Sequence, residues 1–358
     1  MGKLRSMKQE REIYNKQFAD DAKQLVQSIA ELKKARDSDK LPPVEELSQI
    51  WVYTKLGKRC AVVTGGNKGI GYEICRQLAL NGIQVVLTAR NESRGIEAVE
   101  KLNASGIQNV VFHKLDILDS TSIVNLVQFI ETRFKKLDIL VNNAGESGTT
   151  FLDERKFEDG GGLMQVTDED VDLLTGIIEW PYDLGERCLE INYYGTKNVS
   201  EAFVPLLQLS KSSRIVNLSS AYGDMHWFHN EELKQELCDI EKLTEKRIDE
   251  IVQSFLRDFK ADKLRENGWP LTVSAYKVSK AALNGYTRLM ARKFQNILVN
   301  VVNPGYVVTD MTSRTGFLTV EEGAKGPIMV ALLPDDGPSG AYFDKMEIAP
   351  FALTERPL

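Results

Sequence analysis

The sequence predicts an α/β protein with a doubly wound parallel sheet and helices on both of its faces. Two observations support this prediction. Short apolar runs, rich in β-branched residues, alternate with longer stretches that have the spacing of amphipathic helices. The first apolar run is followed by a glycine-rich turn that opens into one of these helices. Parallel strands need helical crossovers between them, and such sheets bind ligands at the carboxyl ends of their strands.

The first strand leads into a turn that predicts a dinucleotide site. Residues 60–63 form this strand, and the turn after it reads Thr64-Gly65-Gly66-Asn67-Lys68-Gly69-Ile70-Gly71. Glycines allow the backbone to approach a pyrophosphate, and the free N–H groups at the start of the following helix attract its negative charge. We therefore predict that residues 64–71 bind the cofactor, with contacts from Thr64, Gly65, Asn67, Lys68, Gly69, Ile70 and Gly71.

Charges near the second strand indicate which dinucleotide is bound. Residues 84–89 form this strand, and Arg90 ends it. An acidic residue near this position suits the ribose hydroxyls of NAD, whereas a basic residue suits the 2′-phosphate of NADP. Arg90 and Lys68, with no nearby carboxylate in the sequence, favour NADP(H). The alternative is that both are solvated surface charges.

The third and fourth strands end in residues placed to contact the same cofactor. Residues 110–113 lead to Asp116 and Ile117, which we expect to border the adenine. The fourth strand, 137–141, opens into a turn of small residues beneath the cofactor, Asn142-Asn143-Ala144-Gly145. Both segments reach the carboxyl edge of the predicted sheet, where ligands collect.

The fifth and sixth strands bring further polar residues to this edge. Residues 214–219 form the fifth strand, which delivers the hydroxyl of Ser220. Residues 299–303 form the sixth, and the cofactor contacts expected after it are Pro304, Gly305, Val308 and Thr309. Between the fourth and fifth strands, Asn192 interrupts an apolar helical stripe, and a buried amide there must find hydrogen-bond partners.

Tyr276 and Lys280 are four residues apart, so on a helix they share one face. An ammonium beside a phenol favours the phenolate, and we therefore expect a lowered pKa for Tyr276. A tyrosine tuned in this way gives a proton to a carbonyl oxygen or takes one from an alcohol. The spacing alone is common on helix surfaces; the turn at 64–71 and the strand-end residues make it indicative of a site.

In this order, the motifs resemble those of the short-chain dehydrogenase/reductase family across roughly residues 58–347. The segments at 63–71, 267–270 and 333–340 are similar to the monomeric carbonyl reductases, in particular to the plant branch of salutaridine reductase and the menthone and neomenthol enzymes. The resemblance implies a Rossmann-type sheet with strand order 3-2-1-4-5-6-7 in one domain, residues 58–358.

The resemblance also implies a reaction, the reversible NADPH-dependent reduction of a ketone or aldehyde. Tyr276 would give the proton, and Lys280 would lower its pKa and bind the nicotinamide ribose. Ser220 would hold the substrate oxygen, and Asn192 would order a water that links Lys280 to solvent. Family members that reduce a carbon–carbon double bond replace this tyrosine, so its presence favours carbonyl reduction. Two alternatives remain, alcohol oxidation with NADP+ and a catalytically silent NADP-binding regulator.

Two insertions, about 146–186 and 222–272, are longer than in short family members. We interpret them as lids over the substrate, and their large apolar residues favour a bulky hydrophobic carbonyl such as a terpenoid or alkaloid ketone, unless they are core: Phe151, Trp180, Met225, Trp227 and Phe228. The second insertion predicts an amphipathic helix from Ile248, Ile251, Val252, Phe255 and Phe259. In the monomeric relatives such a helix covers the oligomerisation surface, which implies a monomer.

The rest of the sequence narrows the class of protein. Residues 1–57 lie outside the resemblance and predict a helical extension of unknown role. A net charge of −6 without a basic cluster argues against nucleic acid as a partner. The apolar runs are too short for a membrane span. Four cysteines and three histidines lack metal-site spacing, so we predict reduced thiols, no metal and a cytoplasmic enzyme acting on a small molecule.

Overall fold

The computed structural model describes residues 59–160, 162 and 167–351. The chain divides into two units, Met1–Lys58 and Arg59–Leu358, and every described residue belongs to the second. The helical extension predicted for residues 1–57 therefore lies outside the described residues.

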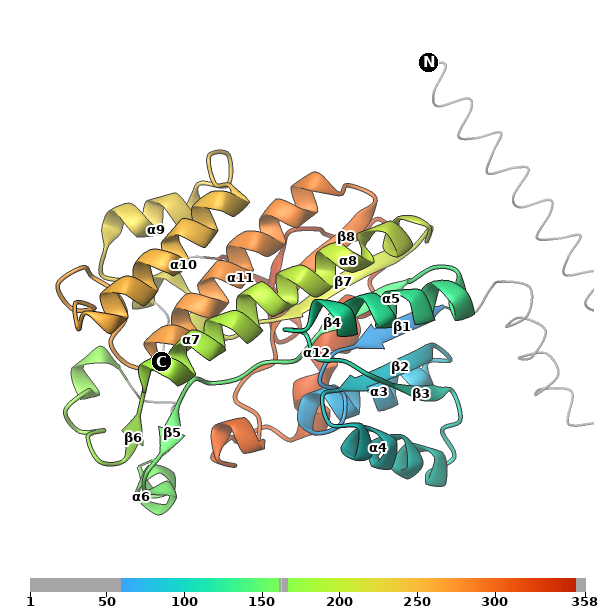
Figure 1. Cartoon of the computed structure of the whole chain (residues 1–358), viewed down its shortest axis with the longest axis horizontal. Helices are drawn as coiled ribbons and strands as arrows, with labels where there is room; N and C mark the ends of the chain where they lie inside the picture. The colour runs from blue at the N-terminus through green and yellow to red at the C-terminus, as the bar shows by residue number, and fades with distance from the viewer. Residues whose placement is uncertain (1–58, 161, 163–166, 352–358) are drawn as a thin grey trace, which may run out of the picture. The chain divides into compact units, whose positions relative to one another are not determined.

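An eight-stranded sheet organises the described residues, and its strand order is β10-β9-β8-β7-β4-β1-β2-β3 (Figure 1). The strands are β1 (Cys60–Val63), β2 (Gln84–Ala89), β3 (Val110–Lys114), β4 (Ile139–Asn142), β7 (Ser213–Leu218), β8 (Ile297–Asn303), β9 (Tyr342–Asp344) and β10 (Glu347–Ala349). All neighbours from β3 to β9 are parallel, which confirms the order 3-2-1-4-5-6-7. β10 pairs antiparallel with β9 and adds an edge strand that the sequence analysis did not predict.

The central strands β1 and β4 are buried along their whole length because helices cover both faces of the sheet. Every residue of β1 and β4 is buried. In the register of the sheet, Val62 lies between Val86 of β2 and Leu140 of β4. A strand that is buried on both faces has a nearly continuous run of hydrophobic residues, and this run allowed these strands to be predicted from the sequence.

Helices on the two faces build two separate cores. On one face α11 (Ser274–Lys293) runs beside the continuous helix formed by α7 (Tyr182–Leu189), the π-helical turn η4 (Glu190–Gly195) and α8 (Thr196–Gln208), with α5 (Ser120–Phe134) next to α8 (Figure 1). The other face is covered by α3 (Gly69–Leu80), α4 (Glu92–Ala104) and α12 (Val320–Ala331). Phe203 and Leu126 centre the first core, and Ile74 and Leu102 the second.

The first insertion forms a small unit with its own core. Its elements are β5 (Thr150–Phe151), α6 (Glu154–Asp159), η3 (Asp168–Asp170) and β6 (Ile178–Glu179). β5 and β6 pair antiparallel in a two-stranded sheet separate from the main one. Phe157, Leu174 and Ile178 pack together and against Val273, the residue before α11. The insertion is therefore attached to the helix that carries Tyr276.

The second insertion contributes α9 (Glu231–Cys238) and α10 (Glu245–Lys260). The amphipathic helix predicted from its apolar spacing is confirmed as α10, whose buried residues are Ile248, Ile251, Val252, Phe255 and Leu256. Phe259 is partly buried. α10 packs against α11 and α7, outside the sheet (Figure 1).

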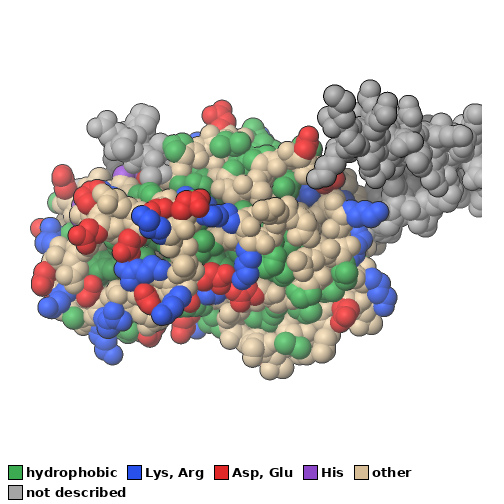
Figure 2. All heavy atoms as spheres, turned by 90° about the horizontal axis from the view of Figure 1, so that it is seen from above, with side chains coloured by type: hydrophobic (Ala, Val, Ile, Leu, Met, Phe, Trp, Pro, Cys, Tyr) green, Lys and Arg blue, Asp and Glu red, His purple; other side chains and the backbone are tan. Residues whose placement is uncertain are grey.

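The described surface carries charges of both signs, which are interspersed on the face seen in Figure 2. Ion pairs on α10 illustrate this mixture: Arg247 lies 2.8 Å from Glu236, and Lys293 of α11 lies 3.1 Å from Glu245. Among the described helices, none combines the length and apolar character needed to cross a membrane.

Candidate active site

A cavity of about 710 Å³ lies at the carboxyl edge of the sheet. It is lined by residues at or after the ends of β1, β2, β3, β4, β7 and β8, together with residues of helical elements that include α7, η4 and α11. Most of the predicted cofactor contacts reach it: Gly65, Asn67, Lys68, Gly69, Ile70, Arg90, Asp116, Ile117, Asn143, Ala144, Gly145, Tyr276, Lys280, Pro304, Val308 and Thr309. The cavity also touches residues that the sequence analysis missed, among them Glu146 and Asp310.

Three predicted contacts, Thr64, Gly71 and Gly305, are not in its lining, and the first two support the turns that form it. Thr64 is buried, and its Oγ1 accepts hydrogen bonds from the N–H groups of Asn143 and Ala144, each at 3.0 Å. A Cβ on Gly71 would lie 2.3 Å from Asn143 Nδ2, so only glycine fits there. These contacts fix the turn after β1 against the turn after β4.

The start of α3 is prepared for an anionic ligand. α4 and α12 begin at side-chain caps, Asn91 and Thr319, which accept N–H groups of the first turn. Lys68, at the equivalent position of α3, makes no side-chain cap, so the first N–H groups of this helix are left for a ligand. Gly65 and Gly69 have φ of +64° and +56°, a conformation that glycine adopts without strain. The turn fits a dinucleotide pyrophosphate.

The two cations predicted to bind the 2′-phosphate have carboxylate partners in the fold, from segments that are distant in the sequence. Arg90 Nη2 lies 3.0 Å from Glu146 Oε1, and Lys68 Nζ lies 2.6 Å from Asp310 Oδ2. The hydrogen bond from Lys68 lowers the pKa of the Asp310 carboxyl. Neither partner could be identified from the sequence, because Glu146 is 56 residues from Arg90 and Asp310 is 242 residues from Lys68.

Tyr276 and Lys280 share one face of α11, as their spacing predicted. The Lys280 Nζ lies 5.3 Å from the centroid of the Tyr276 ring and donates a 2.9 Å hydrogen bond to the Leu218 carbonyl, at the end of β7. Lys280 is buried, and this burial lowers its pKa to about 8. Both side chains reach the cavity from the first turns of the helix.

The expected lowering of the Tyr276 pKa is wrong for this structure. Removal of the phenol from water raises its pKa, although part of the side chain still faces the cavity, and a hydrogen bond with Ser220 opposes the rise. Lys280 does not offset this effect because its ammonium is directed to the Leu218 carbonyl and is itself disfavoured by burial. The phenol is therefore held in its protonated form.

Ser220 and Asn192 have different surroundings. Ser220 follows β7, its Oγ accepts the Tyr222 N–H at 3.1 Å, and its hydroxyl interacts with Tyr276. Asn192 lies in the π-helical turn η4 and is buried, as predicted. Its amide donates to the Glu146 carbonyl at 2.9 Å and accepts the Glu146 N–H at 2.9 Å, which fixes the segment after β4. Single-turn π-helices are frequent at functional sites.

The five apolar residues assigned to the lids divide into two groups. Phe151 and Trp180 belong to the first insertion and pack in the same cluster as the Tyr276 ring. Met225 and Phe228 are core residues, 6% and 1% exposed, which is the alternative that the sequence analysis left open for them. Trp227 is partly buried against this core, and its indole N–H donates to the Ala221 carbonyl at 3.1 Å.

The chain resembles known proteins over most of its length. The short chain dehydrogenase model matches residues 59–167, and the enoyl-(acyl carrier protein) reductase model matches residues 264–330. Salutaridine reductase from Papaver bracteatum is 50% identical over 303 residues, covering 82% of this chain and 96% of the relative. (+)-Neomenthol dehydrogenase from Arabidopsis thaliana is 49% identical over 297 residues, covering 82% and 98%. The chain therefore belongs to the short-chain dehydrogenase/reductase family of oxidoreductases.

Two further comparisons agree with this membership. The structure of salutaridine reductase from Papaver somniferum superposes with a TM-score of 0.74 at 49% identity, covering 80% of this chain and 99% of that one. Carbonyl reductase (NADPH) 3 from Mus musculus is 37% identical over 287 residues, covering 78% of this chain and 92% of the relative. The likeness covers 78% and 80% of this chain in these two comparisons, and it supports reductase activity.

Proposed function

We propose that this chain uses NADPH to reduce a ketone or aldehyde to the alcohol, in a reversible reaction. One observation carries the proposal: a cavity at the sheet edge brings the uncapped start of α3 together with Tyr276 and Lys280. The preference for NADPH rests on the basic residues Arg90 and Lys68 in the same cavity. The name of the relative from Mus musculus, carbonyl reductase (NADPH) 3, supports NADPH as the cofactor.

A nicotinamide cofactor supplies the hydride in this reaction when it is bound. Side chains of the protein would then bind and protonate the substrate oxygen. Ser220 and Tyr276, which interact with each other, would receive the substrate oxygen as its negative charge grows. The raised pKa of Tyr276 keeps its proton available until that charge develops, and the phenol then gives it to the oxygen.

Lys280 and Asn192 would support this proton transfer. The Lys280 ammonium donates to the Leu218 carbonyl and lies 5.3 Å from the centroid of the Tyr276 ring, where it would bind the nicotinamide ribose and add positive charge near the oxygen that is being reduced. The Asn192 amide is committed to Glu146, so we propose that its π-helical turn, with its irregular backbone bonding, orders the water that reaches Lys280.

For the substrate, we propose a bulky hydrophobic carbonyl, such as a terpenoid or alkaloid ketone. The ring of Tyr276 lies in an apolar cluster with Phe151 and Trp180, which favours an apolar body next to the reacting carbonyl. The names of the relatives from Papaver and Arabidopsis support this class. We further propose a monomeric enzyme, because α10 packs on α11. The four cysteines are free thiols, which supports the cytoplasm as its proposed location.

The experiment that tests this proposal follows NADPH consumption by nicotinamide absorbance against menthone, a morphinan ketone, simple quinones and aromatic aldehydes, with NADH in parallel. We expect turnover of a bulky ketone with NADPH and a much lower rate with NADH. Turnover only in the direction of alcohol oxidation would favour the first alternative. NADPH binding without turnover of any compound would contradict the proposal and favour the silent regulator.

A further inference from the structure

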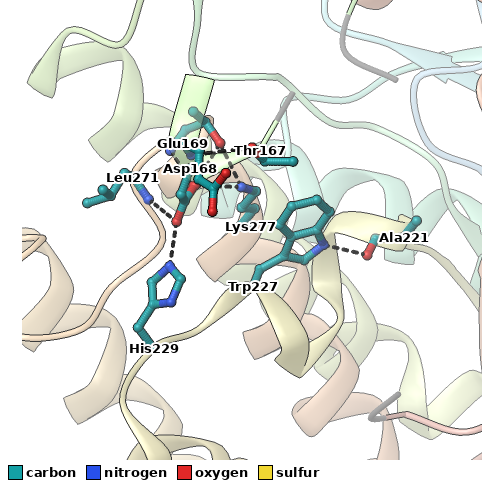
Figure 3. Close-up of polar contacts among 9 residues, drawn as sticks. Thr167, Asp168, Glu169, Ala221, Trp227, His229, Leu271 and Lys277 are labelled. Carbon is teal, nitrogen blue, oxygen red and sulfur yellow. Dashed lines mark hydrogen bonds and ion pairs between the residues drawn. The ribbon is translucent and has the colours of Figure 1, made fainter. Parts of the chain in front are cut away.

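One carboxylate joins both insertions to the helix that carries Tyr276 (Figure 3). Asp168, in the first insertion, accepts hydrogen bonds at Oδ2 from the Leu271 N–H (2.9 Å) and from His229 Nε2 (2.8 Å). Its Oδ1 accepts the N–H (2.9 Å) and the hydroxyl (2.8 Å) of Thr272, in the second insertion. The same oxygen lies 3.2 Å from Lys277 Nζ on α11.

Lys277 makes this contact from a fully buried position. Its side chain is 0% exposed, its Nζ donates to Thr272 Oγ1 at 2.8 Å, and it lies 4.0 Å from a ring centroid of Trp227 (Figure 3). Burial lowers the pKa of Lys277 to about 8, and the Asp168 charge opposes this. A charge removed from water needs a partner, and Asp168 is the carboxylate that supplies it.

Lys277 in turn affects the pKa of Asp168. Burial alone would raise the pKa of Asp168, but the Lys277 ammonium and the hydrogen bonds from Thr272, His229 and Leu271 bring it to about 2. Asp168 is therefore a carboxylate over the whole working range of an enzyme. Its neighbour Asp172, in the same insertion, is exposed.

The backbone next to this carboxylate is strained. Val273 follows Thr272 and precedes α11, and its φ of +48° and ψ of +34° are in the left-handed region, which β-branched residues rarely adopt. Surrounding structure must hold such a residue in place. Asp168 does so from the Thr272 side, and the Lys277 N–H donates to the Val273 carbonyl at 3.0 Å from the helix side. Val273 itself is buried in the cluster that includes the Tyr276 ring.

We propose that Asp168 is a positioning residue, which fastens the first insertion to the start of α11 and thereby sets the place of the Tyr276 phenol. This inference rests on the proposed function, because it assigns the insertion a role in carbonyl reduction. Asp168 acts through Thr272 and Lys277, and it is not among the residues that line the cofactor cavity. We expect replacement of Asp168 to lower kcat/KM for the carbonyl substrate while the affinity for NADPH stays close to that of the parent.

The test compares Asp168→Asn with Asp172→Asn, a matched control that makes the same charge change in the same insertion. Steady-state kcat and KM for the best ketone, NADPH affinity by fluorescence titration and the melting temperature are measured for each. We expect Asp168→Asn to lower kcat/KM about 100-fold, because a small displacement of a reacting group has this effect. Its NADPH Kd stays close to that of the parent, and Asp172→Asn matches the parent throughout.

A double variant separates positioning from simple stability. Asp168→Asn leaves the Lys277 charge buried without its carboxylate, whereas Asp168→Asn with Lys277→Met removes that charge as well. The double variant is expected to recover the melting temperature but not kcat/KM. Recovery of both quantities, or an unchanged kcat/KM in Asp168→Asn alone, would overturn the proposal.

Limited proteolysis tests whether the first insertion is attached to α11 without a measurement of catalytic activity. If the parent reduces no carbonyl, the proposed function fails, but the fastening is still measurable as the rate of cleavage within the first insertion. With NADPH present, Asp168→Asn should be cleaved there about tenfold faster than the parent and Asp172→Asn, because its attached form is less populated. Equal cleavage rates in the three proteins would overturn the inference.

Discussion

At the scale of single residues, Glu146 is placed to affect the choice between NADPH and NADH. Its carboxylate pairs with Arg90 at 3.0 Å and with Arg187 at 3.4 Å, while its backbone is held by Asn192. A 2′-phosphate that binds Arg90 must compete with this carboxylate. We therefore expect Glu146 to lower the affinity of the site for NADPH more than for NADH, which lacks that phosphate.

We accordingly expect Glu146→Gln to bind NADPH several-fold more tightly, the size of effect that an exposed ion pair produces. The backbone contacts with Asn192 are retained, and NADH affinity should stay constant. Fluorescence titration with both cofactors measures this, with Glu179→Gln, an exposed residue of β6, as the control. An equal change for NADPH and NADH would show that Glu146 does not act through the 2′-phosphate.

The titration of Lys280 gives a pH dependence. Burial lowers its pKa to about 8, so the ammonium is present below that pH and is lost above it. Tyr276 stays protonated in this range because its pKa is raised. The rate of carbonyl reduction at saturating NADPH should therefore fall about tenfold per pH unit once the pH exceeds about 8.

The pH profile of kcat between pH 6 and 10 measures this expectation. Lys277 has a pKa of about 8 too, so the profile of Lys277→Met serves as the control. The fall should persist in that variant, whatever its absolute rate, because the titrating group is Lys280. A constant rate up to pH 10 in the parent would contradict the role given to the ammonium.

At the scale of single elements, α10 is an addition to the fold that packs on α11, the helix that carries Tyr276. Phe255 is fully buried and contacts the rings of Phe259 and Trp269. Phe255→Ala should lower the free energy of unfolding by about 3–5 kcal/mol, because it removes a large buried side chain and leaves a cavity. Denaturant titration measures the change.

Gln253→Ala on the exposed face of the same helix is the control, with an expected change within about 0.5 kcal/mol. If both variants lose the same stability, α10 is not attached through its apolar face. The apolar spacing made this helix predictable, whereas the separate core of the first insertion was not, since its residues are dispersed over 157–273.

At the scale of the whole molecule, the sequence predicted the features that local chemistry determines. Buried strands such as β1 and β4 are apolar except for Asn142 at the end of β4, and the turn at 64–71 has glycines at positions of positive φ. The order of the strands came from a family resemblance, because no local signal states which strands are neighbours. The edge strand β10 was missed, since it is three residues long and exposed.

The missed parts of the site depend on contacts between distant segments. Lys68 meets Asp310, and Asp168 meets Lys277, across 242 and 109 residues. Lys277 is beside Tyr276 in the chain, yet neighbours in a helix point in different directions, so its burial could not be anticipated. The pKa of Tyr276 was predicted in the wrong direction for a related reason: the spacing shows the nearby Lys280, but burial is set by the fold as a whole.

Replacement of Tyr276 by phenylalanine tests the central claim most directly. NADPH consumption with the best ketone is measured for the parent, for Tyr276→Phe and for Tyr182→Phe, which removes a hydroxyl bonded to Glu186 on α7. We expect Tyr276→Phe to lose turnover by a factor of about 10²–10⁴ because the proton donor is gone, while NADPH affinity and Tyr182→Phe match the parent. Turnover by Tyr276→Phe equal to that of the parent would contradict the proposed reaction.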